Sequence, residues 1–129
     1  MFRVYIASRY SRRDEMRNVA EQLSERGFIV SSTWLQEDYP LNMNLDGLTP
    51  EQHAEIATQD YDDIVGSDIM VFFAEDQNNQ PPRGGRHVEV GIALALGVRI
   101  YIIGERENIF HYLPDIKVVP NLEALWEVI

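Results

Sequence analysis

The sequence predicts an α/β fold in which a five-stranded parallel sheet lies between two layers of helices. Short β-rich runs alternate along the chain with segments of helical periodicity. The run over residues 69–74 is continuously apolar, as a strand covered on both faces requires. Such alternation favours a parallel sheet, because each helical crossover returns the chain to the same end of the sheet.

The first part of the chain supplies two predicted strands and one predicted helix. Residues 2–7 form a β-rich run, and residues 12–26 carry an apolar stripe at helical spacing that Ser11 is expected to cap. Residues 28–30 begin the second strand, which is expected to run towards Trp34. The polar connection over 36–48 is long for a structureless loop in a small domain, and such loops are usually functional or partly mobile.

The second predicted helix has a clear start signal. Thr49 is placed to cap it, Pro50 takes its first position and Gln52 completes a capping box. We expect this helix to reach about Val65 and to end near Gly66.

The second part of the chain repeats the alternation after the strand at 69–74. Gly97 is expected to end the next helix, and Asn121 to cap the last one. A polar loop over 75–83 is followed by a helix over 84–97 and a strand over 98–103. A loop with one helical turn over 105–113, a short strand over 116–119 and a final helix over 122–129 complete the chain described by this pattern. Together they predict a single domain over residues 1–129 with a flavodoxin-like or Rossmann-like three-layer fold.

The composition narrows the classes of partner. The chain has 11 Lys and Arg against 21 Asp and Glu, a net charge of −10, which disfavours nucleic acid. It has no cysteine, so neither a disulfide frame nor a thiolate metal site is expected. No apolar run approaches the length of a membrane span, and the first residues lack the pattern of a signal peptide. We therefore expect a cytoplasmic protein with a small-molecule ligand.

The predicted helix over 84–97 carries the most informative residue. Gly84 and Gly85 form a turn that lets backbone approach a ligand closely. Glu89 follows between two valines on an otherwise apolar segment. The helix N-terminus favours a negative charge there, so a structural carboxylate is one interpretation. A catalytic carboxylate is the other, because buried acids gather at active sites.

The loop after the first strand is the candidate anion site. It precedes a helix N-terminus and offers hydroxyl and guanidinium groups, which together suit a phosphate. The alternative is a solvated basic helix start. The residues concerned are Ser8, Arg9, Ser11 and Arg12.

Several familiar sites are excluded. The chain contains no Walker loop, no dinucleotide fingerprint and no nucleophile elbow. His53, His87 and His111 lack the spacing of metal ligands, so we expect neither a metal nor a cofactor.

Carboxylates remain as candidates for chemistry. Asp60 on the second helix and Glu89 on the third are both placed to face the cleft beyond the strands. Two carboxylates in different environments are what cleavage of a glycosidic bond needs. Tyr5 is placed to reach a central carboxylate with its hydroxyl, although a core aromatic is an equal interpretation.

The chain resembles the nucleoside 2-deoxyribosyltransferase family, including its branch of 2′-deoxynucleoside 5′-monophosphate N-glycosidases. The resemblance runs through most of the chain and is clearest over residues 4–8, 60–73 and 84–97. The most specific stretch is GGRHVEVGIALALG at 84–97. The segment RENIFH at 106–111 also looks like family members.

The resemblance implies roles for individual residues. It places the nucleophile at Glu89, its activating tyrosine at Tyr5, and the acid that assists departure of the base at Asp60. Arg83 stands where the family usually has a small polar residue, which would suit an anion clamp. The residue pattern and the resemblance together give the expected substrate-binding residues, which are Ser8, Arg9, Ser11, Arg12, Trp34, Arg83, Gly85, Arg86, Asn108 and His111.

The implied reaction is cleavage of the N-glycosidic bond of a nucleoside or nucleoside 5′-monophosphate, through a glycosyl ester of Glu89, by hydrolysis or transfer. A homodimer or higher oligomer is implied as well, with Asn108 or His111 completing a neighbouring site. The rival readings are a non-catalytic nucleotide sensor, a glycohydrolase acting on another nucleotide, and a plain interaction module.

Overall fold

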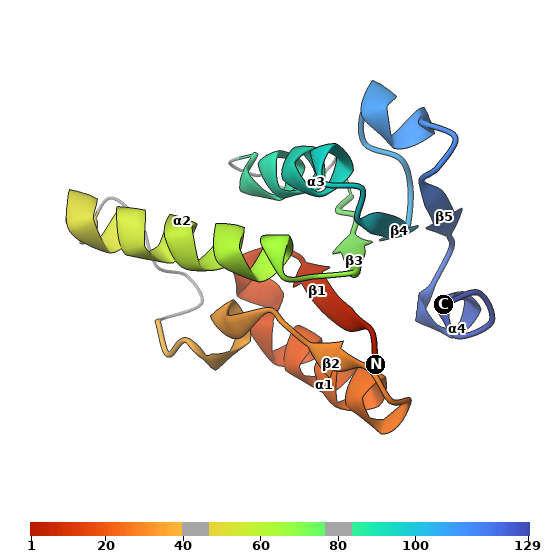
Figure 1. The fold of residues 1–129 in the computed structure, drawn as a ribbon, viewed down its shortest axis with the longest axis horizontal. Helices are drawn as coiled ribbons and strands as arrows, with labels where there is room; N and C mark the ends of the chain where they lie inside the picture. Colours follow the sequence, from red (N-terminus) through yellow and green to blue (C-terminus); the bar gives the residue numbers. More distant parts are fainter. Residues whose placement is uncertain (40–46, 77–83) are drawn as a thin grey trace.

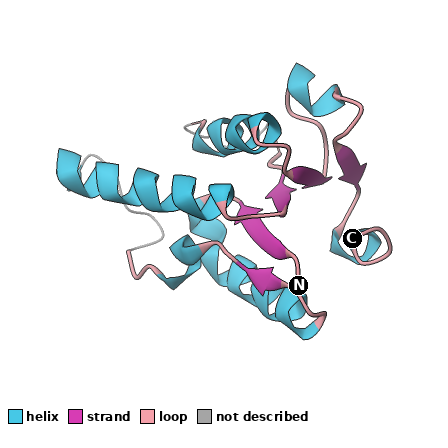
Figure 2. Cartoon of the chain, in the orientation of Figure 1, coloured by secondary structure: helices cyan, strands magenta, loops and turns pink. Residues whose placement is uncertain are grey.

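The sheet of this protein has five parallel strands in the order β2-β1-β3-β4-β5. The structure is a computed structural model that describes residues 1–39, 47–76 and 84–129. The strands are β1 (Arg3–Ala7), β2 (Ile29–Val30), β3 (Ile69–Phe73), β4 (Arg99–Ile103) and β5 (Lys117–Val119). Figures 1 and 2 show them as the middle layer.

Helices cover both faces of the sheet. On one face lie α2 (Pro50–Val65) and α3 (Gly85–Ala95), which contact each other. On the other lie α1 (Arg13–Glu25), which contacts β2, and the short α4 (Leu122–Leu125), which contacts β4 and β5 (Figure 1). The predicted three-layer parallel arrangement is therefore confirmed.

The central strands form the core. All five residues of β3 are buried, as the continuous apolar run predicted. In β1, the side chains from Val4 to Ala7 are fully inaccessible to solvent. The chain runs from β1 outward to β2 and returns to β3 on the other side of β1, which places the topological switch point between β1 and β3.

Several local signals at helix ends were predicted correctly. Thr49 caps α2 through a complete capping box with Gln52, and Pro50 is its first residue. Gly97, which follows the C-cap residue Leu96 of α3, has a positive φ of 74°, where a side chain would be strained. Asn121 accepts a hydrogen bond from the Ala124 amide at 2.9 Å and caps α4.

Two boundaries and one additional turn differ from expectation. Ser11 does not cap α1, because it lies inside a 3-10 turn, η1 (Tyr10–Arg12), that leads into the helix. The last helix ends at Leu125 rather than near Ile129. A second 3-10 turn, η2 (Thr33–Gln36), precedes the polar connection.

Parts of two predicted loops, residues 40–46 and 77–83, lie outside the described residues. The 3-10 turn η4 (Ile109–Tyr112) supplies the helical turn expected between β4 and β5. Within the described ranges, no helix is both long and apolar enough to cross a bilayer.

Candidate active site

Tyr5 and Glu89 meet beside the switch point. Tyr5 lies on β1 with its side chain fully buried, and its hydroxyl donates a hydrogen bond to Glu89 Oε2. Glu89 is the fifth residue of α3, counted from Gly85, so its carboxyl group lies in the second turn of that helix. Tyr5 is thus both a core aromatic and a hydrogen-bond partner of the central carboxylate, so the two interpretations of Tyr5 from the sequence are compatible.

The groups around Glu89 shift its pKa in both directions. Burial raises the pKa of Glu89 to about 8; the Tyr5 hydrogen bond and the charge of Arg86 lower it, and Asp60 raises it further. Burial and then the charge of Glu89 raise the pKa of Tyr5, so the phenol stays protonated and remains a donor. The carboxylate therefore has one dedicated donor that stabilises its ionised form.

Asp60 lies on α2, close enough to Glu89 to act on its charge. Burial raises the pKa of Asp60 to about 7, and the neighbouring carboxyls of Glu37 and Asp63 raise it as well. Its Oδ1 atom is buried and has no hydrogen-bond partner among the described residues. All the named influences thus favour the protonated form of Asp60.

Glu37 and Asp63 were not predicted as parts of the site. Asp63 Oδ2 accepts hydrogen bonds from the Thr33 amide at 2.8 Å and the Thr33 hydroxyl at 2.7 Å, which fastens η2 to α2. This places Glu37, the residue after η2, near Asp60. The spacing of Asp63 three residues after Asp60 puts both on one helix face, but no pattern in the sequence points to Glu37.

The first loop is less open to an anion than predicted. The Arg12 guanidinium pairs with Glu15 at 2.7 Å and with Glu75 at 3.2 Å. The Ser8 hydroxyl donates to the Arg9 carbonyl at 3.0 Å, and Ser11 is exposed. An anion binding here would have to compete with two carboxylates for Arg12.

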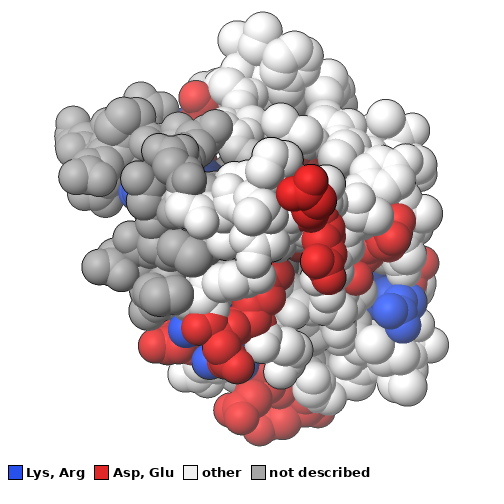
Figure 3. Space-filling view, turned by 90° about the vertical axis from the view of Figure 1, so that its left-hand side faces the viewer, with Lys and Arg blue, Asp and Glu red and all other residues white. Residues whose placement is uncertain are grey.

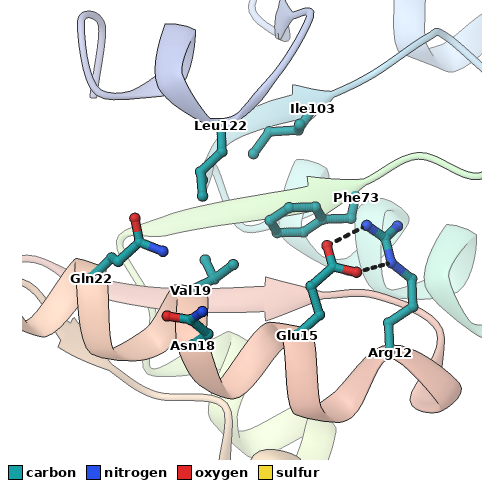
Figure 4. Close-up of a pocket in the computed structure, with 8 residues that line it drawn as sticks. All are labelled: Arg12, Glu15, Asn18, Val19, Gln22, Phe73, Ile103 and Leu122. Atoms are coloured by element: carbon teal, nitrogen blue, oxygen red, sulfur yellow. Dashed lines mark hydrogen bonds and ion pairs between the residues drawn. The ribbon is translucent and has the colours of Figure 1, made fainter.

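Arg12 also lines a pocket on the face covered by α1 and α4. Figure 4 shows Arg12 and Glu15 at one end of this pocket, with Phe73 beside them. The pocket encloses about 250 Å³. Its remaining lining residues are Asn18, Val19, Gln22, Ile103 and Leu122. Glu89 is not among its lining residues and belongs to α3, on the opposite face of the sheet.

Arg86, which was predicted to contact substrate, is buried in an ion pair with Glu107. Its side chain is only 5% exposed, and its guanidinium donates to both carboxylate oxygens of Glu107, at 2.8 and 3.0 Å. It also donates to the Phe73 carbonyl at 3.2 Å. Arg86 therefore joins the start of α3 to the end of β3 and to the β4–β5 connection. Gly85, also predicted to contact substrate, is the exposed first residue of α3.

Two further predicted contacts are turned inward. Trp34 is 6% exposed, and its indole N–H donates to the Ile6 carbonyl at 2.9 Å, so it is a core residue. His111 is 1% exposed, and its Nδ1 accepts the Glu107 amide at 2.9 Å. Burial and the neighbouring His87 lower the pKa of His111 and keep it neutral at neutral pH. A buried ring cannot complete the site of a neighbouring subunit, which corrects that expectation.

Asn108 caps η4 by accepting the Phe110 amide at 2.9 Å, and its Nδ2 lies 3.2 Å from His87 Nδ1. Arg83 lies outside the described residues. Within the described ranges, no group of three or more His, Cys, Asp or Glu is arranged to hold a metal ion.

Comparison with known proteins places the chain by its fold. No protein-family profile and no curated protein matches the sequence. The CMP N-glycosidase BcmB of Clostridium botulinum matches over 91% of this chain and 87% of its own, with 22% identity and a TM-score of 0.58. A 2-deoxyribosyltransferase of Bacillus psychrosaccharolyticus matches over 95% and 89%, with 16% identity and a TM-score of 0.72. The flavodoxin-like fold class is thereby confirmed, and the chain shares its fold with a nucleotide N-glycosidase and a 2-deoxyribosyltransferase, as its sequence motifs led us to expect.

Proposed function

We propose that this protein is an enzyme that cleaves the N-glycosidic bond of a nucleoside 5′-monophosphate or nucleoside. The observation that carries the proposal is the buried contact between the Tyr5 hydroxyl and the Glu89 carboxyl group, with Asp60 close by. An oriented carboxylate beside a second, protonated acid is the minimum set for displacing a base from a sugar. The names of the two structural neighbours agree with this chemistry.

In the proposed first step, ionised Glu89 attacks C1′ of the sugar. The bond between C1′ and the base nitrogen breaks, and its electron pair leaves with the base. Asp60 gives its proton to the departing base, and an ester forms between Glu89 and C1′. In the second step a water attacks C1′ and Asp60 takes its proton, which gives hydrolysis. A second base attacking instead gives transfer.

The Tyr5 hydroxyl has a defined part in both steps. It stabilises the charge of Glu89 before attack, and it stabilises the same charge again when the ester breaks. Its raised pKa keeps the proton on the phenol, so the hydrogen bond persists as the carboxylate changes state. Tyr5 thereby orients the nucleophile without exchanging a proton with it.

The substrate is proposed to be small and bound at the edge where β1 and β3 end. On the face shown in Figure 3 acidic side chains predominate over basic ones, which agrees with the net charge of −10 and disfavours a nucleic-acid partner. Whether a phosphate is part of the substrate depends on the loop of Ser8, Arg9 and Ser11 and on release of Arg12 from its carboxylate partners.

The test is release of free base from a panel of ribo- and deoxyribonucleosides and their 5′-monophosphates, followed by chromatography. Glu89→Ala should lower base release by about a thousand-fold or more, because the nucleophile is removed. Asp62→Asn, an exposed carboxylate on the same helix as Asp60, is the matched control and should keep wild-type activity. Unchanged activity of Glu89→Ala would contradict the role of Glu89 as the nucleophile. A wild-type protein that binds these compounds without releasing base would contradict the proposed enzymatic activity.

We also propose that the working form is a homo-oligomer. Ile109, Phe110 and Tyr112 on η4 are 78%, 60% and 69% exposed. Val88 on α3, 63% exposed, follows His87, which contacts Asn108 just before η4. Adjoining exposed apolar side chains of this kind are typical of a protein interface.

A further inference from the structure

The start of η4 is attached to α3 through a single amide side chain, that of Asn108. Its Oδ1 accepts a hydrogen bond from the Phe110 amide at 2.9 Å and caps the turn. Its Nδ2, at the other end of the same group, lies 3.2 Å from Nδ1 of His87, the third residue of α3. The two contacts depend on each other, because turning the amide over would break both.

These contacts determine which nitrogen of His87 carries the proton. The Phe110 amide is a donor and needs the oxygen of Asn108, which leaves the NH₂ group facing the ring. An NH₂ group only donates, so Nδ1 of His87 accepts and its proton is on Nε2. That Nε2 lies 3.9 Å from Glu107 Oε1. The contact between Asn108 and His87 therefore exists only while Nδ1 is unprotonated.

His111 is held in the same tautomer from within η4. Its Nδ1 accepts the Glu107 amide at 2.9 Å, and its Nε2 is buried without a hydrogen-bond partner among the described residues. The rings of His87 and His111 lie 5.6 Å apart, and both pack against the Phe72 ring of β3. Protonated His111 would have no acceptor for either N–H, whereas the His87 side chain is 30% exposed and faces the Glu107 carboxylate. His87 is therefore the ring that takes up a proton first.

The charged groups around the two rings keep both neutral at neutral pH. Burial lowers the pKa of His87; the charge of Glu107 opposes this and the charge of Arg86 adds to it, so the pKa is lowered on balance. Burial lowers the pKa of His111 as well, and its positive neighbours outweigh Glu107. Those neighbours are His87, Arg86 and Arg106.

We propose that Asn108 is a proton-controlled switch between α3 and η4. While His87 is neutral, the amide oxygen caps η4 and the amide nitrogen donates to the ring. When Nδ1 of His87 takes a proton from solvent, two donors face each other, and the amide turns over so that its oxygen accepts from the ring. The Phe110 amide then loses its cap, which loosens η4. The switch is independent of the proposed reaction, since neither Asn108 nor His87 takes part in that scheme.

The consequence of the switch falls on the surface of η4. Ile109, Phe110 and Tyr112 are exposed there and directly follow the capping residue. Their backbone is held by the cap above the titration midpoint of His87 and released below it. The apolar surface that these residues form should therefore be ordered at neutral pH and loosened at mildly acidic pH.

NMR titration of the wild-type protein tests the switch without any substrate. Nitrogen spectra of the imidazole rings should show the Nε2–H tautomer for His87 and His111 at neutral pH. On acidification, His87 should titrate with a midpoint below the ordinary value of about 6.5, and the backbone amide of Phe110 should shift with the same midpoint. His87→Gln assigns the ring signal and should abolish this acid-induced shift of the Phe110 amide.

Asn108→Asp changes the contact in a direction that can be predicted. One carboxylate oxygen still caps Phe110, and the other replaces the amide nitrogen beside His87. The midpoint of His87 should rise by about one pH unit or more, and the Phe110 amide should no longer follow it. Asn121→Asp is the matched control, because Asn121 caps α4 in the same way, by accepting the Ala124 amide at 2.9 Å. It should leave the midpoint of His87 unchanged.

The outcomes are distinct. A neutral His87 with its proton on Nδ1, or a wild-type Phe110 amide that does not follow the His87 titration, overturns the switch even if the variants do not fold. An unchanged His87 midpoint in Asn108→Asp overturns it as well. Release of base plays no part in these measurements, so the switch and the proposed reaction are tested separately.

Discussion

Asp60 and Glu89 have raised pKa values for the same first reason, burial, but their other neighbours differ. The proposed reaction needs Glu89 ionised and Asp60 protonated at once. Tyr5 stabilises the charge on Glu89, and Glu37 disfavours charge on Asp60. Burial nevertheless leaves the pKa of Glu89, about 8, above that of Asp60, about 7, so the required combination of charges is a minority state at neutral pH.

The pH dependence of activity follows from these values. The reaction requires ionised Glu89, with a pKa of about 8, together with protonated Asp60, with a pKa of about 7. Only a minority of the enzyme holds that combination at any pH, and kcat/KM should follow a bell with its limbs near these two values. Asp60→Asn has no acidic proton to lose, so it should lack the basic limb and lose about 10²–10⁴-fold in rate. Measurement of kcat/KM against pH checks this, and an unchanged basic limb would remove Asp60 from the role of acid.

Single residues were the hardest to predict from the sequence. Glu89 stood out because a carboxylate on an apolar helix is unusual. Asp60 and Tyr5 were candidates by their places on the predicted elements, and the resemblance added their roles as acid and activating tyrosine. Arg86 was predicted as a substrate contact, and Glu37 was not predicted at all. Arg86 is occupied by Glu107, and Glu37 lies near Asp60 only because η2 packs on α2. Such long-range pairings leave no local pattern in a single sequence.

At the scale of elements, the start of α3 is held by a buried ion pair. Glu107 binds Arg86 through both oxygens, accepts the Glu75 amide at 3.3 Å, and donates its own amide to His111. Burial raises the pKa of Glu107, but the hydrogen bonds and charge of Arg86 outweigh it and the pKa is lowered on balance. The carboxylate of Glu107 thus joins the end of β3 to the start of α3, and its backbone amide adds the turn η4.

Glu107→Gln should lower the free energy of unfolding by about 3–5 kcal/mol, because it leaves the Arg86 charge buried without its partner. Denaturant unfolding measures this. The double variant Arg86→Met with Glu107→Leu should recover most of the loss, since it removes both charges. Glu105→Gln, at an exposed position in the same connection, should change stability by no more than about 0.5 kcal/mol. Equal effects of Glu105→Gln and Glu107→Gln would contradict the assigned role.

Element boundaries were predictable where several signals coincide. The Thr49 capping box, Pro50 and the glycine after α2 were all read correctly. Ser11 was assigned as a cap, but it lies inside the 3-10 turn η1, which leads into α1. The short α4 retains its Asn121 cap but ends at Leu125.

At the scale of the whole molecule, the alternation of strands and helices was enough to predict the layers and the parallel sheet. A continuous apolar strand and right-handed crossovers leave few arrangements open. The surface is less predictable, because exposure of an apolar residue depends on how every element packs. The sequence alone did not reveal that Ile109, Phe110 and Tyr112 lie outside the core while His111 between them lies inside.

This exposed group gives a test of assembly. We expect the wild-type protein to sediment as a dimer or higher oligomer, and Phe110→Asp to shift it toward the monomer by placing a charge in the apolar contact. Phe2→Asp is the control, because Phe2 is 57% exposed at the N-terminal end of the sheet, away from η4 (Figure 1). A monomeric wild type at micromolar concentration would contradict the proposed oligomer.

The hydrogen bond from Tyr5 to Glu89 spans 84 positions of sequence and joins the first strand to the third helix. No fragment that lacks either segment can contain the complete constellation, and a chain still being synthesised acquires it only after α3 has docked. Turnover is therefore a stringent reporter of completed folding, since partly assembled forms that retain helices by spectroscopy would remain inert.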